Sequence, residues 1–222
     1  MELIPAIDIL NNIVVKPIAG ERKKYKAIQS PIVNSSKLDH IVESLLNEYD
    51  FKKIYIADLN AIAGVKNNFT IIESIIAKYP YIDFWVDFGI RTFLDFKQSR
   101  NLACTLIIGS ETLKSVLELK KIIKKMKRER IVLSLDFKNN SFLGPSSLIY
   151  EKQLWTKKII LMSLDNIGSN KGPNLNNYDQ INCGLKNELY LAGGVRNNKD
   201  IFLLKKKGIK GVILSSAIHK RK

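Results

Sequence analysis

Residues 83–91 read DFWVDFGIR, and residues 188–196 read ELYLAGGVR. In each stretch, a short apolar run is followed by glycine, a β-branched residue and arginine. Other landmarks share this period of 105 to 107 residues, namely Asp58 with Asp165 and Ser110 with Ser216. Three matches in register indicate that a unit of about half the chain is used twice, because repeats of this length are half-domains and not solenoid units.

Short apolar runs of the same kind recur along the whole chain. They are continuous and not alternating, which is typical of parallel strands covered on both faces. The eight candidates are residues 3–7, 53–57, 83–87, 104–108, 131–135, 158–162, 188–192 and 211–214.

Eight strands with helices between them predict an α/β fold, the (β/α)8 TIM barrel. We expect one domain over residues 1–222, built from half-barrels of about 1–115 and 116–222. The alternative is a doubly wound open sheet, but its glycine-rich dinucleotide turn is missing after the first strand.

Amphipathic segments between the strands predict helices over residues 37–49, 68–78, 93–99, 113–128 and 198–207. Three of them have candidate caps: Ser36, Thr92, and either Asn197 or Asn198. Only residues 215–222 follow the last strand, so we expect the eighth outer helix to be short or absent. The apolar face left open would then be covered by shifted neighbouring helices or by a second chain, and we favour a homodimer.

The formal net charge of +15 favours polyanionic partners in general, yet the lysines are spread along the chain. The densest run, KKIIKKMKRER over residues 120–130, fits the solvated face of an amphipathic helix. No nucleic-acid-binding signature, signal peptide or membrane span is expected. Two distant cysteines, Cys104 and Cys183, agree with a reducing, cytoplasmic location.

Carboxylates follow five of the predicted strands, at the barrel end where active sites are built: Asp8, Asp58, Asp87, Asp136 and Asp165. Asp8 and Asp136 follow strands one and five, which are opposed in an eight-stranded barrel. Two carboxyls on opposite sides of a substrate suit a general acid and a general base. We expect Asp8 and Asp136 to be catalytic and the other three to support them.

Glycine and serine mark the ends of strands three, four, seven and eight and predict anion sites, because glycine lets an oxyanion approach backbone N–H groups. Loops seven and eight form the common phosphate site of this fold. The repeat predicts a second site at loops three and four, and so a ligand with a phosphate at each end. The candidates are Gly89, Gly109, Ser110, Gly193, Gly194, Ser215 and Ser216, with Gly20, Arg22 and Arg91 as further phosphate- or substrate-binding residues.

Several motifs resemble the HisA/HisF histidine-biosynthesis barrel family, which comprises the ProFAR isomerase and the cyclase subunit of imidazole glycerol phosphate synthase. They run in order along the chain: Ile4-Pro5-Ala6-Ile7-Asp8, Ile56-Ala57-Asp58-Leu59, Gly89-Ile90-Arg91, Ile108-Gly109-Ser110, Leu133-Ser134-Leu135-Asp136, Gly172-Pro173-Asn174, Gly193-Gly194-Val195 and Gly211-Val212-Ile213. The resemblance implies that Asp8 is the base, that Asp136 is the acid, and that the ligand is a bisphosphate.

Departures from the family pattern occur at Asp87, in loop six, at Ser215-Ser216 and in the basic stretch over residues 20–26. They look more like a related subgroup of methanogens and methylotrophs that use methanopterin- or methanofuran-type one-carbon coenzymes. The leading hypothesis is an Amadori-type aldose–ketose isomerase, without metal or cofactor, acting on a phosphorylated sugar or aminosugar. The alternatives are a HisF-like cyclase or lyase, a non-catalytic phosphate-binding barrel, and a polyanion-binding protein.

Overall fold

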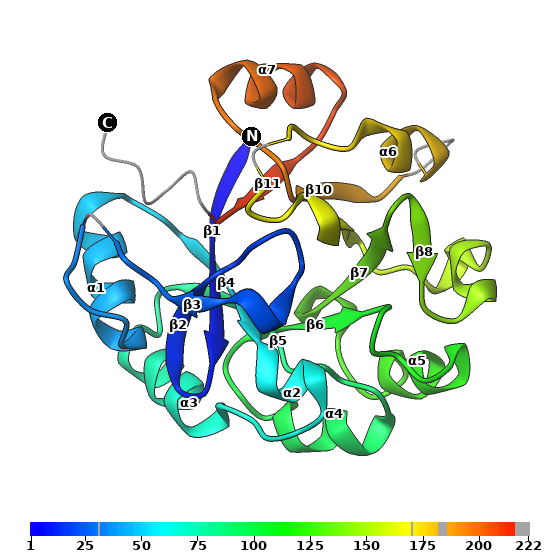
Figure 1. Ribbon diagram of the computed structural model, residues 1–222. Coiled ribbons are helices and arrows are strands. Elements are labelled where there is room, and N and C mark those ends of the chain that lie inside the picture. Colours follow the sequence, from blue (N-terminus) through cyan, green and yellow to red (C-terminus); the bar gives the residue numbers. More distant parts are fainter. Residues whose placement is uncertain (31, 170, 182–185, 216–222) are drawn as a thin grey trace.

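The computed structural model describes residues 1–30, 32–169, 171–181 and 186–215 (Figure 1). Eight parallel strands close into a barrel, because the last strand pairs with the first from Glu2↔Gly211 to Pro5↔Leu214. The predicted (β/α)8 fold is confirmed. The strands are β1 (Glu2–Leu10), β4 (Lys53–Asp58), β5 (Asp83–Asp87), β6 (Thr105–Gly109), β7 (Ile131–Lys138), β9 (Lys158–Ser163), β10 (Glu188–Ala192) and β11 (Gly211–Leu214).

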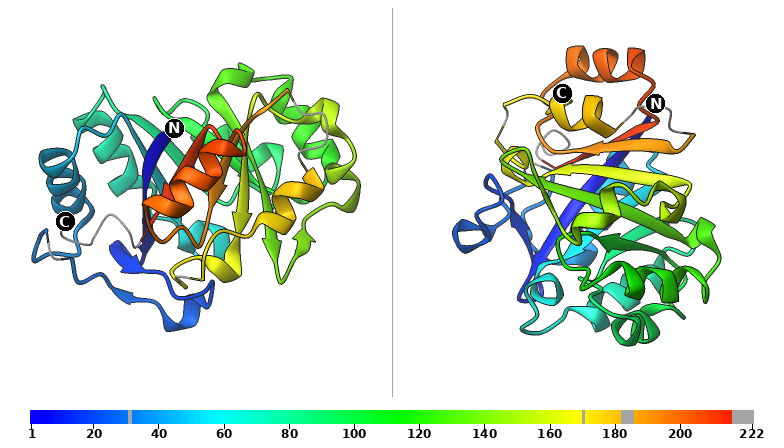
Figure 2. Two further views of the ribbon diagram at one scale, coloured as in Figure 1. Left: turned by 90° about the horizontal axis from the view of Figure 1, so that it is seen from above. Right: turned by 90° about the vertical axis from the view of Figure 1, so that its right-hand side faces the viewer.

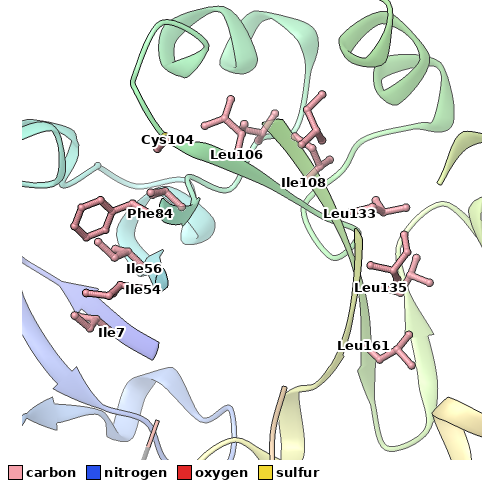
Figure 3. Packing of buried hydrophobic residues seen from close by; sticks show 14 of the residues in the cluster. Ile7, Ile54, Ile56, Phe84, Cys104, Leu106, Ile108, Leu133, Leu135 and Leu161 are labelled. Atoms are coloured by element: carbon pink, nitrogen blue, oxygen red, sulfur yellow. The ribbon is translucent and has the colours of Figure 1, made fainter. Parts of the chain in front are cut away.

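Apolar side chains pack in two layers, one outside the strands and one inside the barrel. The outer layer lies between strands and helices, and Figure 3 shows part of it, including Ile7, Phe84 and Leu133. The inner layer fills the barrel, where Trp85 and Tyr190 meet edge to face with ring centroids 4.9 Å apart. This packing closes the lower barrel and leaves the end at which the strands finish, here called the mouth, for other side chains.

Five outer helices fall where the sequence predicts them: α1 (Leu38–Glu48), α3 (Phe69–Lys78), α4 (Phe93–Ser99), α5 (Val116–Ile123) and α7 (Asn198–Lys206). Thr92 forms a capping box with Asp95, and the Asn197 side chain caps α7. The cap expected from Ser36 is wrong, since Lys37 is the N-cap residue of α1 and makes no side-chain bond. Two short helices, α2 (Leu59–Ala63) and α6 (Leu175–Ile181), were not predicted.

The helix predicted over residues 113–128 is shorter than expected. It begins after Ser115, whose side chain caps it, and ends at Ile123, before a short 3₁₀ turn at Arg128–Arg130. Lysines three and four residues apart repel one another along one helix face, which disfavours continuing through this run.

The unit between β7 and β9 has no α-helix. Its segment holds β8 (Ser141–Leu143), antiparallel to β7, and two 3₁₀ turns, Ser146–Ile149 and Lys152–Leu154. Leu148 and Trp155 supply the apolar cover that a helix would otherwise give.

A hairpin extends β1 beyond the mouth. It is made by β2 (Ile13–Lys16) and β3 (Lys26–Ala27), with a 3₁₀ turn at Arg22–Lys24 between them. Figure 2 shows this blue segment beside the yellow segment that follows β9. The Ala19 N–H donates to the Ile167 carbonyl at 2.7 Å, which joins the two loops.

Residues 216–222 lie outside the described residues. The expectations for Ser216 and for a short or absent eighth outer helix fall there. Within the described ranges, no helix combines the length and the apolarity that crossing a bilayer requires.

Candidate active site

A cavity of about 410 Å³ opens at the mouth of the barrel. It is the end at which enzymes of this architecture place their active sites. Its lining includes eight residues that the sequence singled out: Asp8, Gly20, Arg22, Asp87, Asp136, Gly193, Gly194 and Ser215.

Asp8 and Asp87 lie in one layer of the barrel interior. Asp8 pairs with Ala57 across β1 and β4, and Ala57 pairs with Asp87 across β4 and β5. Paired residues of neighbouring strands face the same side of a sheet, and the small Ala57 leaves room between the two carboxyls. Burial raises the pKa of each carboxyl to about 7, an effect that Arg22 partly opposes.

The two carboxyls differ in their partners. Oδ1 of Asp87 accepts the backbone N–H of Gly89 at 2.8 Å. The Asp8 carboxyl has no hydrogen-bond partner among the described residues. Asp8 is therefore the carboxyl most available to a molecule in the cavity.

Asp136, on the opposite strand β7, is almost fully buried and firmly held. Its Oδ1 accepts the Ser134 hydroxyl at 2.6 Å, and its Oδ2 accepts the backbone N–H of Glu111 at 2.9 Å. Burial still raises the pKa of Asp136 to about 8, reinforced by the nearby charges of Glu111 and Asp87. Asp136, like Asp8 and Asp87, therefore keeps its proton to a higher pH than an exposed Asp does.

Arg22 reaches across the mouth from the hairpin. Its Nη2 lies 2.6 Å from Oε1 of Glu111, which follows β6. The same guanidinium acts electrostatically on Asp8 and Asp87. Arg22 is thus at the carboxylate side of the cavity, paired with an acid.

The loop after β10 lines the cavity with Gly193, Gly194 and Val195. Gly193 and Gly194 have φ values of +99° and +85°, which L side chains rarely adopt. A Cβ on Gly194 would lie 2.0 Å from the Gly172 carbonyl oxygen. Within the described part of the chain, no acceptor takes the N–H groups of Gly194 and Val195. This loop, with Ser215 beside it, fits an anion.

The equivalent loops after β5 and β6 differ. The Gly89 N–H is taken by Asp87, and the Ser110 N–H donates to the Ser134 carbonyl at 2.9 Å. The Ser110 hydroxyl is buried and accepts the Asp136 N–H at 2.8 Å. The structure therefore does not bring Gly89, Gly109 and Ser110 together as an open anion site.

Three other predicted residues lie outside the cavity lining. Asp58 points away from the interior, where its side chain caps α2 and accepts from Asn68. Asp165 lies beyond the end of β9 and accepts the Asn139 N–H at 3.4 Å. The Arg91 guanidinium donates to the carbonyls of Ala61, Gly89 and Ile62, so it braces two loops.

The chemistry available in this cavity is acid–base and electrostatic. The described residues contain no group of three or more His, Cys, Asp and Glu side chains with the arrangement of a metal site. Three carboxyls with raised pKa values and the glycine loop after β10 line the same barrel mouth. Comparison with known proteins gives this arrangement a family.

The family model described as histidine biosynthesis protein matches residues 2–222. The chain belongs to the histidine biosynthesis family. The resemblance expected from its motifs is thereby confirmed over nearly the whole chain.

Relatives within the histidine biosynthesis family cover the chain from end to end. An uncharacterized protein of Methanocaldococcus jannaschii is 32% identical over 224 residues, which is 99% of this chain and 94% of the relative. The isomerase of Buchnera aphidicola, named for an imidazole-4-carboxamide that carries one phosphoribosyl and one phosphoribosylamino group (ProFAR isomerase), is 27% identical, and the isomerase of the same name from Methanosphaera stadtmanae is 26% identical. Each also covers 99% of this chain and 94% of its own length.

Glu111, Tyr25 and Lys138 are among the cavity-lining residues of this histidine biosynthesis family member that the sequence did not single out as site residues. Glu111 directly follows Ser110, so the loop that predicted an anion site also carried an acid. Tyr25 and Lys138 lie where the chain turns back over the mouth, and only the hairpins reveal their position.

Proposed function

We propose that the protein is a cytoplasmic isomerase that converts a phosphorylated aminoaldose to the corresponding aminoketose by an Amadori-type rearrangement. One observation carries the proposal: Asp8 and Asp136 both line one cavity from opposed strands, and among the described residues only Asp136 of the two has hydrogen-bond partners for its carboxyl. The relatives named as isomerases support the same reaction class.

Asp136 serves as the acid in the first step. Its carboxyl, with a pKa of about 8, gives its proton to the sugar ring oxygen as the bond from that oxygen to C1 breaks. The nitrogen lone pair forms the C1=N bond, so the ring opens to a protonated Schiff base.

Asp8 serves as the base in the second step. With a pKa of about 7 it is substantially ionised at neutral pH, and it removes the proton on C2. The electron pair moves to give an enolamine, which takes a proton at C1 and loses one from the C2 hydroxyl to become the aminoketose. The environments of Asp8 and Asp136 divide the roles of base and acid between two residues of one type.

The substrate phosphate binds at the loop after β10 under this proposal. The N–H groups of Gly194 and Val195 and the neighbouring Ser215 supply the donors. Arg22 acts from the other side, where its bond to Glu111 holds it over the carboxyls. The pathway served is either histidine biosynthesis or the synthesis of a one-carbon coenzyme.

Turnover of aminoaldose phosphates tests the proposal directly. The purified protein is incubated in D₂O with ProFAR and with monophosphate N-ribosyl arylamines, and loss of the C2 hydrogen signal is followed by proton NMR. We expect exchange and ketose formation with at least one of them. Binding of phosphate ligands with no exchange at C2 would instead favour a non-catalytic barrel.

A further inference from the structure

We propose that the cavity accepts a ligand with a single phosphate, bound at the loop after β10, and that Asp87 excludes a second phosphate from the loop after β5. The inference rests on the proposed function and narrows its substrate class. The two loops, one at each end of the cavity, are related by the internal repeat of the sequence.

The two loops occupy equivalent places in the half-barrels. A shift of 105 residues carries Gly89 onto Gly194 and Arg91 onto Arg196. It also carries Trp85 onto Tyr190, and these two rings meet inside the barrel. Gly89 and Gly194 both have positive φ, at +59° and +85°, so the backbone turns alike at the two ends.

The same shift carries Asp87 onto Ala192. At the β10 end, the Ala192 methyl group offers no acceptor, and the Gly194 N–H has no partner among the described residues. At the β5 end, the Asp87 carboxylate accepts the Gly89 N–H at 2.8 Å. The side chain of Asp87 thus supplies, from within the protein, the anion that a ligand would supply at the other end.

Further acids surround the β5 end. Glu111 follows β6, and its own N–H is already taken by Asp136. Arg22 neutralises one of these three carboxyls through its 2.6 Å contact with Glu111. A phosphate here would face the Asp87 carboxylate, which has no ion-pair partner among the described residues, in a partly desolvated cavity where like-charge repulsion is strong.

Carboxylates accept hydrogen bonds and attract cations, so this end suits hydroxyl or amino groups. The ligand therefore has one phosphate and a far end rich in hydrogen-bond donors. The isomerases of Buchnera and Methanosphaera differ in this respect, since their names describe a substrate with two phosphoribosyl groups.

Crystals soaked in inorganic phosphate test the inference by the number of sites at the mouth. We expect the wild-type protein to bind one phosphate, at Gly194 and Val195. The double variant Asp87→Ala, Glu111→Ala should bind a second phosphate at Gly89. Asp165→Ala removes a carboxylate outside the cavity lining and should still bind one.

Each other outcome has a definite meaning. Phosphate at both loops of the wild-type protein would overturn the inference and leave the proposed function standing. A double variant that keeps its far-ultraviolet circular dichroism spectrum but gains no second phosphate would also overturn it. Phosphate at neither loop of the wild-type protein would contradict the proposed function itself. If the double variant does not fold, the wild-type count alone decides.

Discussion

At the scale of single residues, the mouth of the barrel concentrates carboxyls that ordinary exposure would keep ionised. Asp8, Asp87 and Asp136 all titrate near neutrality because burial disfavours their charged forms. Their hydrogen bonds differ, and Asp8 alone of the three has no partner among the described residues. Different surroundings for one side-chain type are what an acid–base pair requires.

Replacing Asp87 by asparagine should change how stability depends on pH. In the unfolded chain an Asp has a pKa of about 3.9. In the folded protein the pKa of Asp87 is about 7. The folded state binds more protons between these values, so the Asp87 contribution to stability is complete below about pH 4 and is lost as pH rises to about 7.

Asparagine keeps the acceptor for Gly89 but carries no titrating proton. From pH 5 to pH 8, the free energy of unfolding of Asp87→Asn should therefore rise relative to that of the wild type by about 1–3 kcal/mol. Urea unfolding at the two pH values measures it, with the exposed Asp50→Asn as control. If the difference in free energy of unfolding between variant and wild type is the same at both pH values, burial does not raise the pKa of Asp87.

At the scale of elements, the alternation of side chains along a strand decides which acids face the cavity. Asp8 pairs with Ala57, whereas Asp58 pairs with Ile9 and so faces the outer layer. The sequence predicted both acids at strand ends, but it did not predict the register of strand pairing, which sets the side that each acid faces. Asp165 lies two residues beyond Ser163, the end of β9, in a 3₁₀ turn. Local signals such as the Thr92 capping box were readable, because they depend on neighbours three residues apart.

The turn after β10 should tolerate no side chain at Gly194. Alanine there would combine an unfavourable φ of +85° with a Cβ 2.0 Å from the Gly172 oxygen. We expect Gly194→Ala to lose about 3 kcal/mol or more and to abolish the thermal stabilisation given by inorganic phosphate. Differential scanning fluorimetry with and without phosphate measures both effects.

Gly208→Ala is the matched control for this change. Gly208 has a similar φ of +82°, but a Cβ there meets nothing within 4 Å. It should cost about 1 kcal/mol and leave phosphate stabilisation intact. Equal effects of the two variants on phosphate binding would remove the β10 loop from the site.

At the scale of the whole molecule, the barrel class and its ring of parallel strands followed from the sequence because they depend on patterns of burial. The contact between Arg22 and Glu111 did not, since it joins residues 89 positions apart through a hairpin that crosses the mouth. The missing helix after β7 was also unforeseen. The antiparallel strand β8 and two 3₁₀ turns take its place.

Homodimerisation remains a prediction. Leu3, on the outer side of β1, and Phe202, on α7, are 41% and 60% exposed in the described part of the chain. We expect light scattering at micromolar concentration to give about twice the 25.3 kDa of one chain. A mass of one chain, with no binding of a dye to exposed apolar surface, would contradict the homodimer and favour the alternative that neighbouring helices shift to cover the open apolar face.

The most direct test of the account compares wild type, Asp8→Asn and Asp136→Asn in D₂O with an aminoaldose phosphate that the wild type turns over. The quantity measured, called exchange below, is the loss of the C2 hydrogen together with the uptake of deuterium at C1. We expect each variant to keep its phosphate binding and to unfold at a temperature no lower than that of the wild type, while its rate falls by about 10²–10⁴. Asp8→Asn should lose exchange even with substrate already in the open-chain form, because the C2 proton has no acceptor. Asp136→Asn should recover exchange with the open-chain form, because ring opening is then no longer needed. Near wild-type exchange in Asp8→Asn would contradict the assignment of this carboxyl as the base.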